Sequence, residues 1–195
     1  MCQKMVYPTH RPNRMSCGCG KKNKSFNPIF SDNPITSSDP TTWGPCFWFM
    51  MHTMAEKTGH ASSPIINGDH AAIFRWLVEQ LPTIIPCQEC QAHARTYLLA
   101  HPPTWMKAVG NDLRIQIRTW VFNFHTSVRS RIGQPTTVIS PDDCIALYAH
   151  ETINPAFITD LSHHITFAVR SGWVRIDSWK RWVTQFNRMK LMLNS

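Results

Sequence analysis

The eight residues Pro86-Cys87-Gln88-Glu89-Cys90-Gln91-Ala92-His93 are the most informative stretch of this 195-residue sequence. Proline is favoured at the start of a helix, and Pro102 and Pro103 end a helical pattern that runs from about Cys87 to Ala100. Two cysteines at this spacing share the first helical turn, where the helix dipole and the free backbone N–H groups stabilise a thiolate. The stretch therefore predicts a redox-active disulfide at the beginning of a helix.

The same cysteine pair has a second interpretation, as half of a zinc site that includes His93. Zinc needs four ligands, and the sequence has no second Cys-x-x-Cys at zinc-finger spacing, although Cys144 and His101 could contribute. Under this alternative, the chain would be a zinc-stabilised helical binding protein with basic ends. The residue pattern favours the redox interpretation, and we assign no metal ligands.

The rest of the chain shows helical periodicity and no series of period-two strands. A first helix is predicted near Trp43, capped by Thr41 or Thr42, and a loop with Gly59, Ser63, Pro64 and Gly68 follows it. Further helices are expected from Asp69, from Asp112 to Ile132, from Ser140-Pro141 to His150, and over 155–169 and 176–193. The predicted fold class is all-α, a bundle of four or five helices with an additional C-terminal helical segment.

Composition narrows the class of protein further. Hydrophobic residues make up 43% and charged residues 16%, which is typical of a globular domain. The net charge of +8 is concentrated at the two ends, since 1–25 hold six bases and no acid, so no specific nucleic acid partner is expected. No apolar run approaches the roughly 20 residues that span a bilayer, and no signal peptide is visible. We therefore expect a cytoplasmic protein in which cysteines have redox roles.

Three blocks of the sequence, in order, resemble the Erv/ALR family of sulfhydryl oxidases. The first is Trp43-Gly44-Pro45 with Trp48 and His52-Thr53, and the second is Pro86–His93, a Cys-x-x-Cys followed by histidine. The third is Trp120 with His125, Val128 and Ile132-Gly133-Gln134-Pro135, which is similar to the family's flavin-binding helix. Together the blocks cover roughly residues 41–150.

The resemblance implies a helical bundle around FAD and a thiol oxidase activity that forms disulfide bonds. Cys87 and Cys90 would be the catalytic pair, with Cys90 facing the flavin and Cys87 exchanging with dithiols. The implied substrates are thiol-containing proteins and molecular oxygen, which is reduced to hydrogen peroxide, and the implied assembly is a homodimer. The implied cofactor-binding residues are Trp43, Gly44, Trp48, His52, Cys90, His93, Trp120, His125, Val128 and Arg129.

The sequence departs from the family pattern at several positions. The family's His-Asn-x-Val-Asn is His125-Thr126-Ser127-Val128-Arg129 here, and Gln134 replaces the usual lysine, so Arg129 or Arg131 would supply charge to the phosphates. Cys144 matches one end of a structural disulfide of many members, but Phe122 stands at the other end. That bridge is absent in some members from large cytoplasmic DNA viruses, so host cytoplasm or the virion is the expected location. Cys46 and Cys144 are expected to be buried thiols.

The first 40 residues read as a flexible basic leader, rich in proline and without apolar periodicity. We therefore divide the chain into a leader (1–40), an FAD-binding oxidase domain (41–150) and a C-terminal helical extension (151–195). The leader contains Cys17-Gly18-Cys19, followed by Lys21 and Lys22. Some family members carry a shuttle cysteine pair on a mobile tail, and Cys17 with Cys19 would fill that role here.

Overall fold

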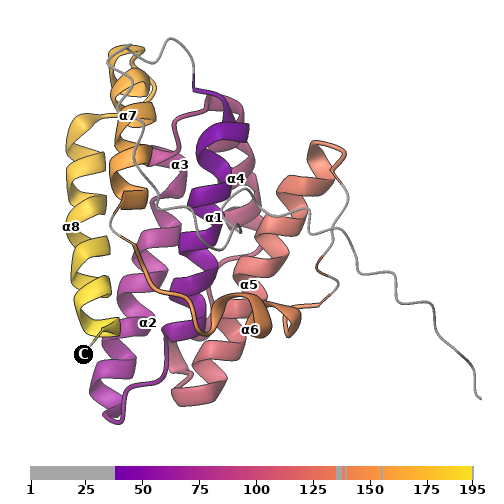
Figure 1. Ribbon diagram of the computed structural model, residues 1–195, viewed down its shortest axis with the longest axis vertical. Coiled ribbons are helices and arrows are strands. Elements are labelled where there is room, and N and C mark those ends of the chain that lie inside the picture. The colour runs from indigo at the N-terminus through magenta and orange to yellow at the C-terminus, as the bar shows by residue number, and fades with distance from the viewer. Residues whose placement is uncertain (1–37, 135–137, 139, 155, 195) are drawn as a thin grey trace, which may run out of the picture.

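The computed structural model describes residues 38–134, 138, 140–154 and 156–194, and every element within these ranges is a helix (Figure 1). This confirms the all-α prediction. The leader cysteines Cys17 and Cys19 lie outside the described residues. The elements are α1 (Pro40–Lys57), α2 (Pro64–Glu79), α3 (Leu81–Ile84), α4 (Gln88–Ala100), the 3₁₀ helix η1 (Trp105–Lys107), α5 (Gly110–Arg131), α6 (Asp143–Tyr148), α7 (Ala156–Arg170) and α8 (Ile176–Leu193).

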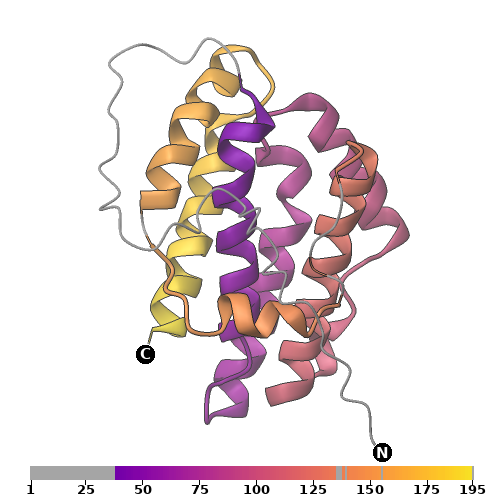
Figure 2. The same cartoon turned by 45° about the vertical axis from the view of Figure 1, so that its right-hand side comes forward.

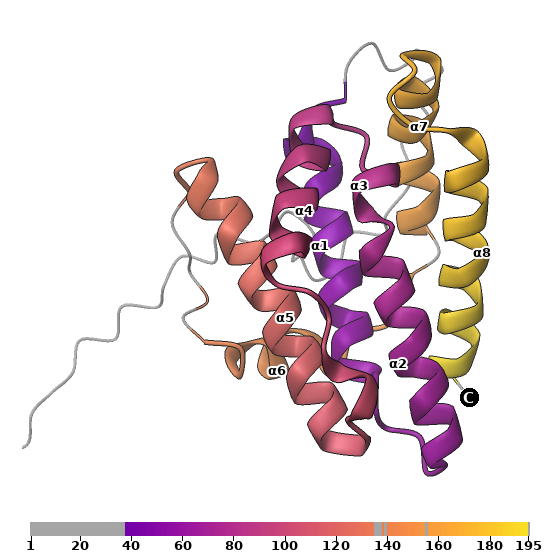
Figure 3. The same ribbon diagram turned by 180° about the vertical axis from the view of Figure 1, so that it is seen from behind.

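Helix α1 lies in the middle of the bundle, packed against α5, α6 and α7 (Figure 2). Helix α8 packs along α2 and α3, on the side of the molecule opposite α5 (Figure 3). The C-terminal segment is therefore an additional helical layer on the bundle. The ring N–H of Trp182 on α8, a fully buried side chain, donates to the carbonyl of Leu77 on α2 at 3.0 Å. Truncation of a tryptophan buried in this way costs about 3–5 kcal/mol of stability.

Three predicted helix starts were wrong, each for a local reason. Asp39, not Thr41 or Thr42, caps α1, because its carboxylate accepts the N–H of Thr41 at 2.8 Å and Pro40 follows it. Helix α2 begins at Pro64 instead of Asp69, since proline suits the first helical position and Gly68 is tolerated on the exposed face.

The third wrong start is that of α6. A turn occupies Pro141 and Asp142, and the helix begins only at Asp143, whose carboxylate accepts the backbone N–H of Ser140 at 2.9 Å. The remaining predicted helices agree with the structure to within a few residues, and α8 has the predicted bounds. The short α3 and the 3₁₀ turn η1 were not predicted.

Candidate active site

The two cysteines of the Cys-x-x-Cys form a disulfide, with their Cα atoms 5.2 Å apart. Cys87 is the N-cap residue of α4, and its Sγ accepts a hydrogen bond from the backbone N–H of Cys90 at 3.2 Å. Both side chains are half-buried. The pair therefore lies where it was predicted, at a helix N-terminus that stabilises the thiolate formed when the disulfide opens.

A guanidinium group lies beside one of the two sulfurs. Nη2 of Arg131, at the end of α5, is 3.9 Å from Sγ of Cys90, and Nη1 is 3.9 Å from the exposed carboxylate of Glu89. A positive charge at this place favours Cys90 as a thiolate. The sequence suggested Arg131 only as a phosphate ligand, because nothing local indicates that the last turn of α5 reaches the first turn of α4.

Four ring side chains from three helices form two stacked pairs that meet at His52 and His125, together called the stack. Phe124 links the stack to His93 on α4, with ring centroids 5.3 Å from Trp48 and 6.1 Å from His93. The ring of Trp48 lies parallel to that of His125, with centroids 4.2 Å apart, and Nε2 of His52 is 3.0 Å from Nδ1 of His125. Tyr148 on α6 covers the other side of His52, with parallel rings 4.7 Å apart. The structure thus brings together Trp48, His52 and His125, three of the residues that the resemblance implies for the cofactor. Tyr148 was missed because nothing in the sequence placed α6 against α1.

Both histidines of the stack are neutral at neutral pH. Burial lowers the pKa of His52 to about 4. The pKa of His125 falls to about 3, mainly through burial and also because His52 and Arg129 lie close to it. Two neutral rings share one hydrogen bond, so one nitrogen donates and the other accepts.

His93 connects α4 to α5 one turn away from the disulfide. Its Nε2 is 3.0 Å from Oγ of Ser127, and that hydroxyl already donates to the carbonyl of Phe124 at 2.8 Å. The hydroxyl oxygen therefore accepts, and His93 carries its proton on Nε2. Burial lowers the pKa of His93, and the charge of Arg131 lowers it further.

The other predicted cofactor-binding residues are spread along α1 and α5. The ring N–H of Trp120 donates to the carbonyl of His101 at 2.8 Å, and the ring packs among Tyr97, Trp105 and Phe124. Val128 packs at the edge of the hydrophobic core and Arg129 is half-buried. Trp43 and Gly44 are buried in the first turns of α1.

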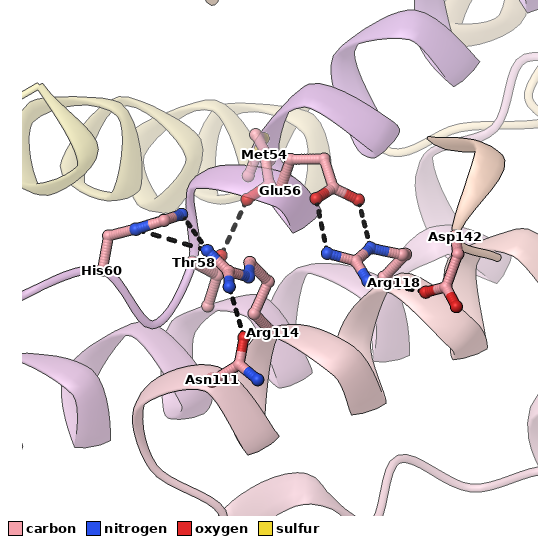
Figure 4. A network of polar contacts seen from close by, with 8 residues as sticks. All are labelled: Met54, Glu56, Thr58, His60, Asn111, Arg114, Arg118 and Asp142. Carbon is pink, nitrogen blue, oxygen red and sulfur yellow. Dashed lines mark hydrogen bonds and ion pairs between the residues drawn. The ribbon is translucent and has the colours of Figure 1, made fainter. Parts of the chain in front are cut away.

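A second polar cluster lies at the other end of α1 (Figure 4). The guanidinium of Arg118 on α5 binds Glu56 on α1 through two hydrogen bonds of 2.6 and 2.8 Å, and both side chains are almost fully buried. A third hydrogen bond of 3.2 Å joins Arg118 to Asp142, just before α6. Nearby, Arg114 contacts His60 and Asn111. The sequence analysis missed this cluster, although Glu56 falls one turn after His52 on the buried stripe.

The remaining thiols and the metal alternative can be placed as well. Cys144 is buried, and burial raises its pKa to about 12, whereas Cys46 is only half-buried, contrary to prediction.

No group of three potential metal-binding side chains occurs in the part of the chain that the structure describes. The sulfurs of Cys87 and Cys90 are bonded to each other, which leaves neither as a thiolate for zinc. Within the described ranges, no helix has the length and apolar character of a membrane span.

Comparisons with known proteins agree with this site. Residues 45–147 match the model of the Erv1/Alr family. The African swine fever virus FAD-linked sulfhydryl oxidase is 29% identical over 112 residues, which are 57% of this chain and 84% of that protein. No solved structure matches the chain.

Two proteins of invertebrate iridescent viruses are also similar, and both carry FAD-linked sulfhydryl oxidase as a provisional name. Protein 347L of Invertebrate iridescent virus 6 is 32% identical over 104 residues, 52% of this chain and 88% of the relative. Protein 096R of Invertebrate iridescent virus 3 is 30% identical over 99 residues, 51% of this chain and 62% of the relative. The family match covers more than half of the chain and includes both cysteines of the disulfide, and this protein belongs to the Erv1/Alr family.

Proposed function

We propose that this protein is an FAD-dependent thiol oxidase that makes disulfide bonds in dithiol substrates. The observation that carries the proposal is the Cys87–Cys90 disulfide at the N-terminus of α4, the helix whose His93 is linked through Phe124 to the ring of Trp48. The names of the viral relatives support the same activity.

The residues around the site fit FAD. The ring N–H of Trp43 and Nδ1 of His52 are buried polar atoms that have no hydrogen-bond partner among the described residues. A Cβ added at buried Gly44 would meet no heavy atom within 4 Å beyond its own neighbours and helix backbone, so there is room beside α1. Unpartnered polar atoms and flat rings suit a large aromatic cofactor. We assign the binding to Trp43, Gly44, Trp48, His52, Cys90, His93, Trp120, His125, Val128 and Arg129.

The reaction begins with thiol–disulfide exchange. A substrate thiolate attacks Sγ of Cys87, the Cys87–Cys90 bond breaks, and Cys90 leaves as a thiolate. Arg131, 3.9 Å from Sγ of Cys90, favours this leaving group. The second substrate thiol then displaces Cys87, so the substrate loses two electrons and two protons and the pair becomes a dithiol. The Cys87–Cys90 disulfide forms again when the dithiol gives up two electrons and two protons. A bound FAD would supply the acceptor for these electrons and their route to molecular oxygen, which would become hydrogen peroxide.

Several finer assignments belong to the same proposal. We assign the exchange with substrate to Cys87 and the contact with flavin to Cys90. We propose that the oxidase domain spans 41–150, preceded by a leader (1–40) and followed by the helical extension (151–195), and that the protein acts as a homodimer. The viral relatives support a site of action in the host cytoplasm or the virion.

The decisive test measures both the bound flavin and the effect of replacing each cysteine of the pair. Purified protein should be yellow, with a flavin spectrum, and should consume oxygen when given dithiothreitol. Cys87→Ser and Cys90→Ser should each abolish that turnover, because neither single thiol can close a disulfide. A colourless protein that releases zinc to a chelator, or full activity in either variant, would contradict the proposal.

Cys17 and Cys19 are proposed as a shuttle that relays electrons from protein thiols to Cys87. The double variant Cys17→Ser/Cys19→Ser should lose oxidation of protein thiols and keep oxidation of dithiothreitol, which is small enough to reach the pair directly. Wild-type rates with both substrates would show that these cysteines are not a shuttle.

A further inference from the structure

Gln91 directly follows Cys90, and its side chain joins two segments that are far apart in sequence. Its Nε2 donates one hydrogen bond to the carbonyl of Ile85 at 2.8 Å and another to the carbonyl of Trp173 at 3.0 Å. An amide nitrogen has two N–H groups, so both are used. Trp173 lies 82 residues away, in the turn between α7 and α8.

The first acceptor belongs to the backbone that carries Cys87. The carbonyl of Ile85 also accepts the backbone N–H of Cys87 at 2.9 Å, and Ile85 itself is buried. Gln91 therefore bonds the same oxygen that orients Cys87. Through this oxygen, the side chain fixes the entry of the chain into the first turn of α4.

The second acceptor is held in a rigid turn. The N–H groups of Gly172 and Trp173 donate back to the carbonyls of Val169 and Ala168 at 3.0 and 2.8 Å, which is the Schellman motif at the end of α7. Gly172 has φ of 74°, a left-handed conformation that favours glycine. The ring of Trp173 packs edge-on against Phe167. The carbonyl that receives Gln91 is thus fixed in place by the fold of the C-terminal layer.

This layer also supports the segment before Cys87 from another side. Helix α8 packs against α3, which ends one residue before Ile85, and Trp182 bonds the carbonyl of Leu77 on α2. Both α7 and α8 lie beyond residues 45–147, the part of the chain that matches the family.

We propose that Gln91 is a positioning residue for the Cys87–Cys90 pair, through which the α7–α8 turn fixes the backbone of Cys87. Holding this backbone restricts the open dithiol more than the closed ring, because the dithiol has more freedom to lose. The two hydrogen bonds of Gln91 therefore favour the disulfide, and removing them should make the Cys87–Cys90 pair easier to reduce. The inference rests on the proposed function for the use of the pair, while its test measures the pair itself.

The main test is Gln91→Met in the full chain, which keeps the shape of the side chain and removes both donors. Wild type and variant are equilibrated in the absence of oxygen with mixtures of oxidised and reduced dithiothreitol, and the peptide with Cys87 and Cys90 is scored by alkylation and mass spectrometry. We expect the equilibrium to shift toward the dithiol by about threefold to tenfold, as for the loss of one or two modest hydrogen bonds. Gln185→Met, at a half-buried position on α8, is the matched control and should leave it unchanged.

A second variant disturbs the acceptor of the hydrogen bond between Gln91 and Trp173 instead of its donor. Gly172→Val has room for its side chain but strains the left-handed turn, which displaces the Trp173 carbonyl. It should shift the same equilibrium in the same direction. The double variant should be no worse than the stronger single one, because Gln91→Met already removes the hydrogen bond that Gly172→Val disturbs. Gln91→Asn, one methylene too short to bridge the two carbonyls, replaces Gln91→Met if that variant does not fold.

An unchanged equilibrium in the Gln91 variant, or additive effects of Gln91→Met and Gly172→Val, would overturn the inference. Neither outcome depends on oxidase activity. Absence of oxygen consumption by the wild-type protein with dithiothreitol would instead contradict the proposed function, and the equilibrium measurement would stand.

Discussion

Two polar pairs connect α1 to α5, about one turn apart on α1 and two turns apart on α5, and they differ in how completely their hydrogen bonds are satisfied. The lower pair, near the C-terminal end of α1, is Glu56 and Arg118. These two share two hydrogen bonds, and Arg118 makes a third to Asp142. The upper pair, one turn earlier on α1, is His52 and His125. These two share a single contact of 3.0 Å, and Nδ1 of His52 has no partner among the described residues. Both pairs lie in the same helix interface.

The number of satisfied hydrogen-bonding atoms separates a pair that stabilises the fold from a pair that is available to a ligand. Buried polar groups are almost always hydrogen-bonded, so a saturated pair needs nothing further and serves the fold. An unsaturated pair keeps a buried hydrogen-bonding atom for a ligand. The lower pair should therefore control stability, and the upper pair should control the cofactor.

The largest effect is expected from Arg118→Met. This change leaves the Glu56 carboxylate buried without its counter-charge, which costs about 3–5 kcal/mol of unfolding free energy. Urea denaturation of the flavin-free protein measures it. Glu56→Leu/Arg118→Met should regain much of the loss, because it removes both charges. A single variant as stable as wild type would contradict the structural role of the pair.

His52→Phe should have the opposite profile. The flavin-free protein should lose only about 1 kcal/mol, since His125 loses one hydrogen bond while the unpartnered Nδ1 disappears. FAD affinity should fall about tenfold, the equivalent of one good hydrogen bond. Flavin titration measures the affinity, and His150→Phe, on the exposed surface, is the control. Wild-type FAD affinity in His52→Phe would show that His52 does not contact the cofactor.

The upper pair also predicts a dependence of stability on pH. The folded pKa values of about 4 and about 3 lie below the ordinary histidine value, so the unfolded chain binds protons that the folded chain does not. The unfolding free energy of flavin-free protein should therefore fall as pH drops below about 6.5, by up to about 1.4 kcal/mol per pH unit for each ring. Urea denaturation between pH 5 and 7.5 tests this, and His52→Phe should have a shallower slope; equal slopes would refute the assignment.

The smallest effect is expected at a charge pair on the surface. Arg75 and Glu79 on α2 are 2.7 Å apart, but both side chains are largely exposed. Arg75→Met should change the unfolding free energy by no more than about 0.5 kcal/mol. In the same urea experiment, a loss as large as that of Arg118→Met would mean that burial does not explain the difference between the pairs.

Local signals explain which parts of the fold could be predicted. Prolines bracket α4, and α8 follows an uninterrupted amphipathic stripe, so both were predicted closely. Trp48, His52 and His125 were singled out by the family resemblance, because helical spacing alone does not show which faces meet. The start of α2 was missed because Pro64 and Gly68 were taken as loop residues, although proline at the first turn extends a helix backward.

Contacts between distant segments could not be derived in the same way. Arg131 is 41 residues from Cys90, Arg118 is 62 from Glu56, and Trp173 is 82 from Gln91. Each partner has an ordinary local role as a helix-end cation, a helical polar residue or a turn residue. Glu56 falls on the buried stripe of α1, where a carboxylate needs a partner, but its position in the sequence does not identify that partner.

The position of Trp173, 82 residues after Gln91, has a consequence for biosynthesis. The cysteines of α4 leave the ribosome before the turn that holds them, and 82 residues take roughly 4 to 16 seconds to synthesise at usual rates. During that interval α2 and α3 lack the covering helix α8, and Gln91 lacks one of its two acceptors. In a newly made chain, Gln91 thus gains its second hydrogen bond only after the turn that follows α7 has been synthesised and has folded.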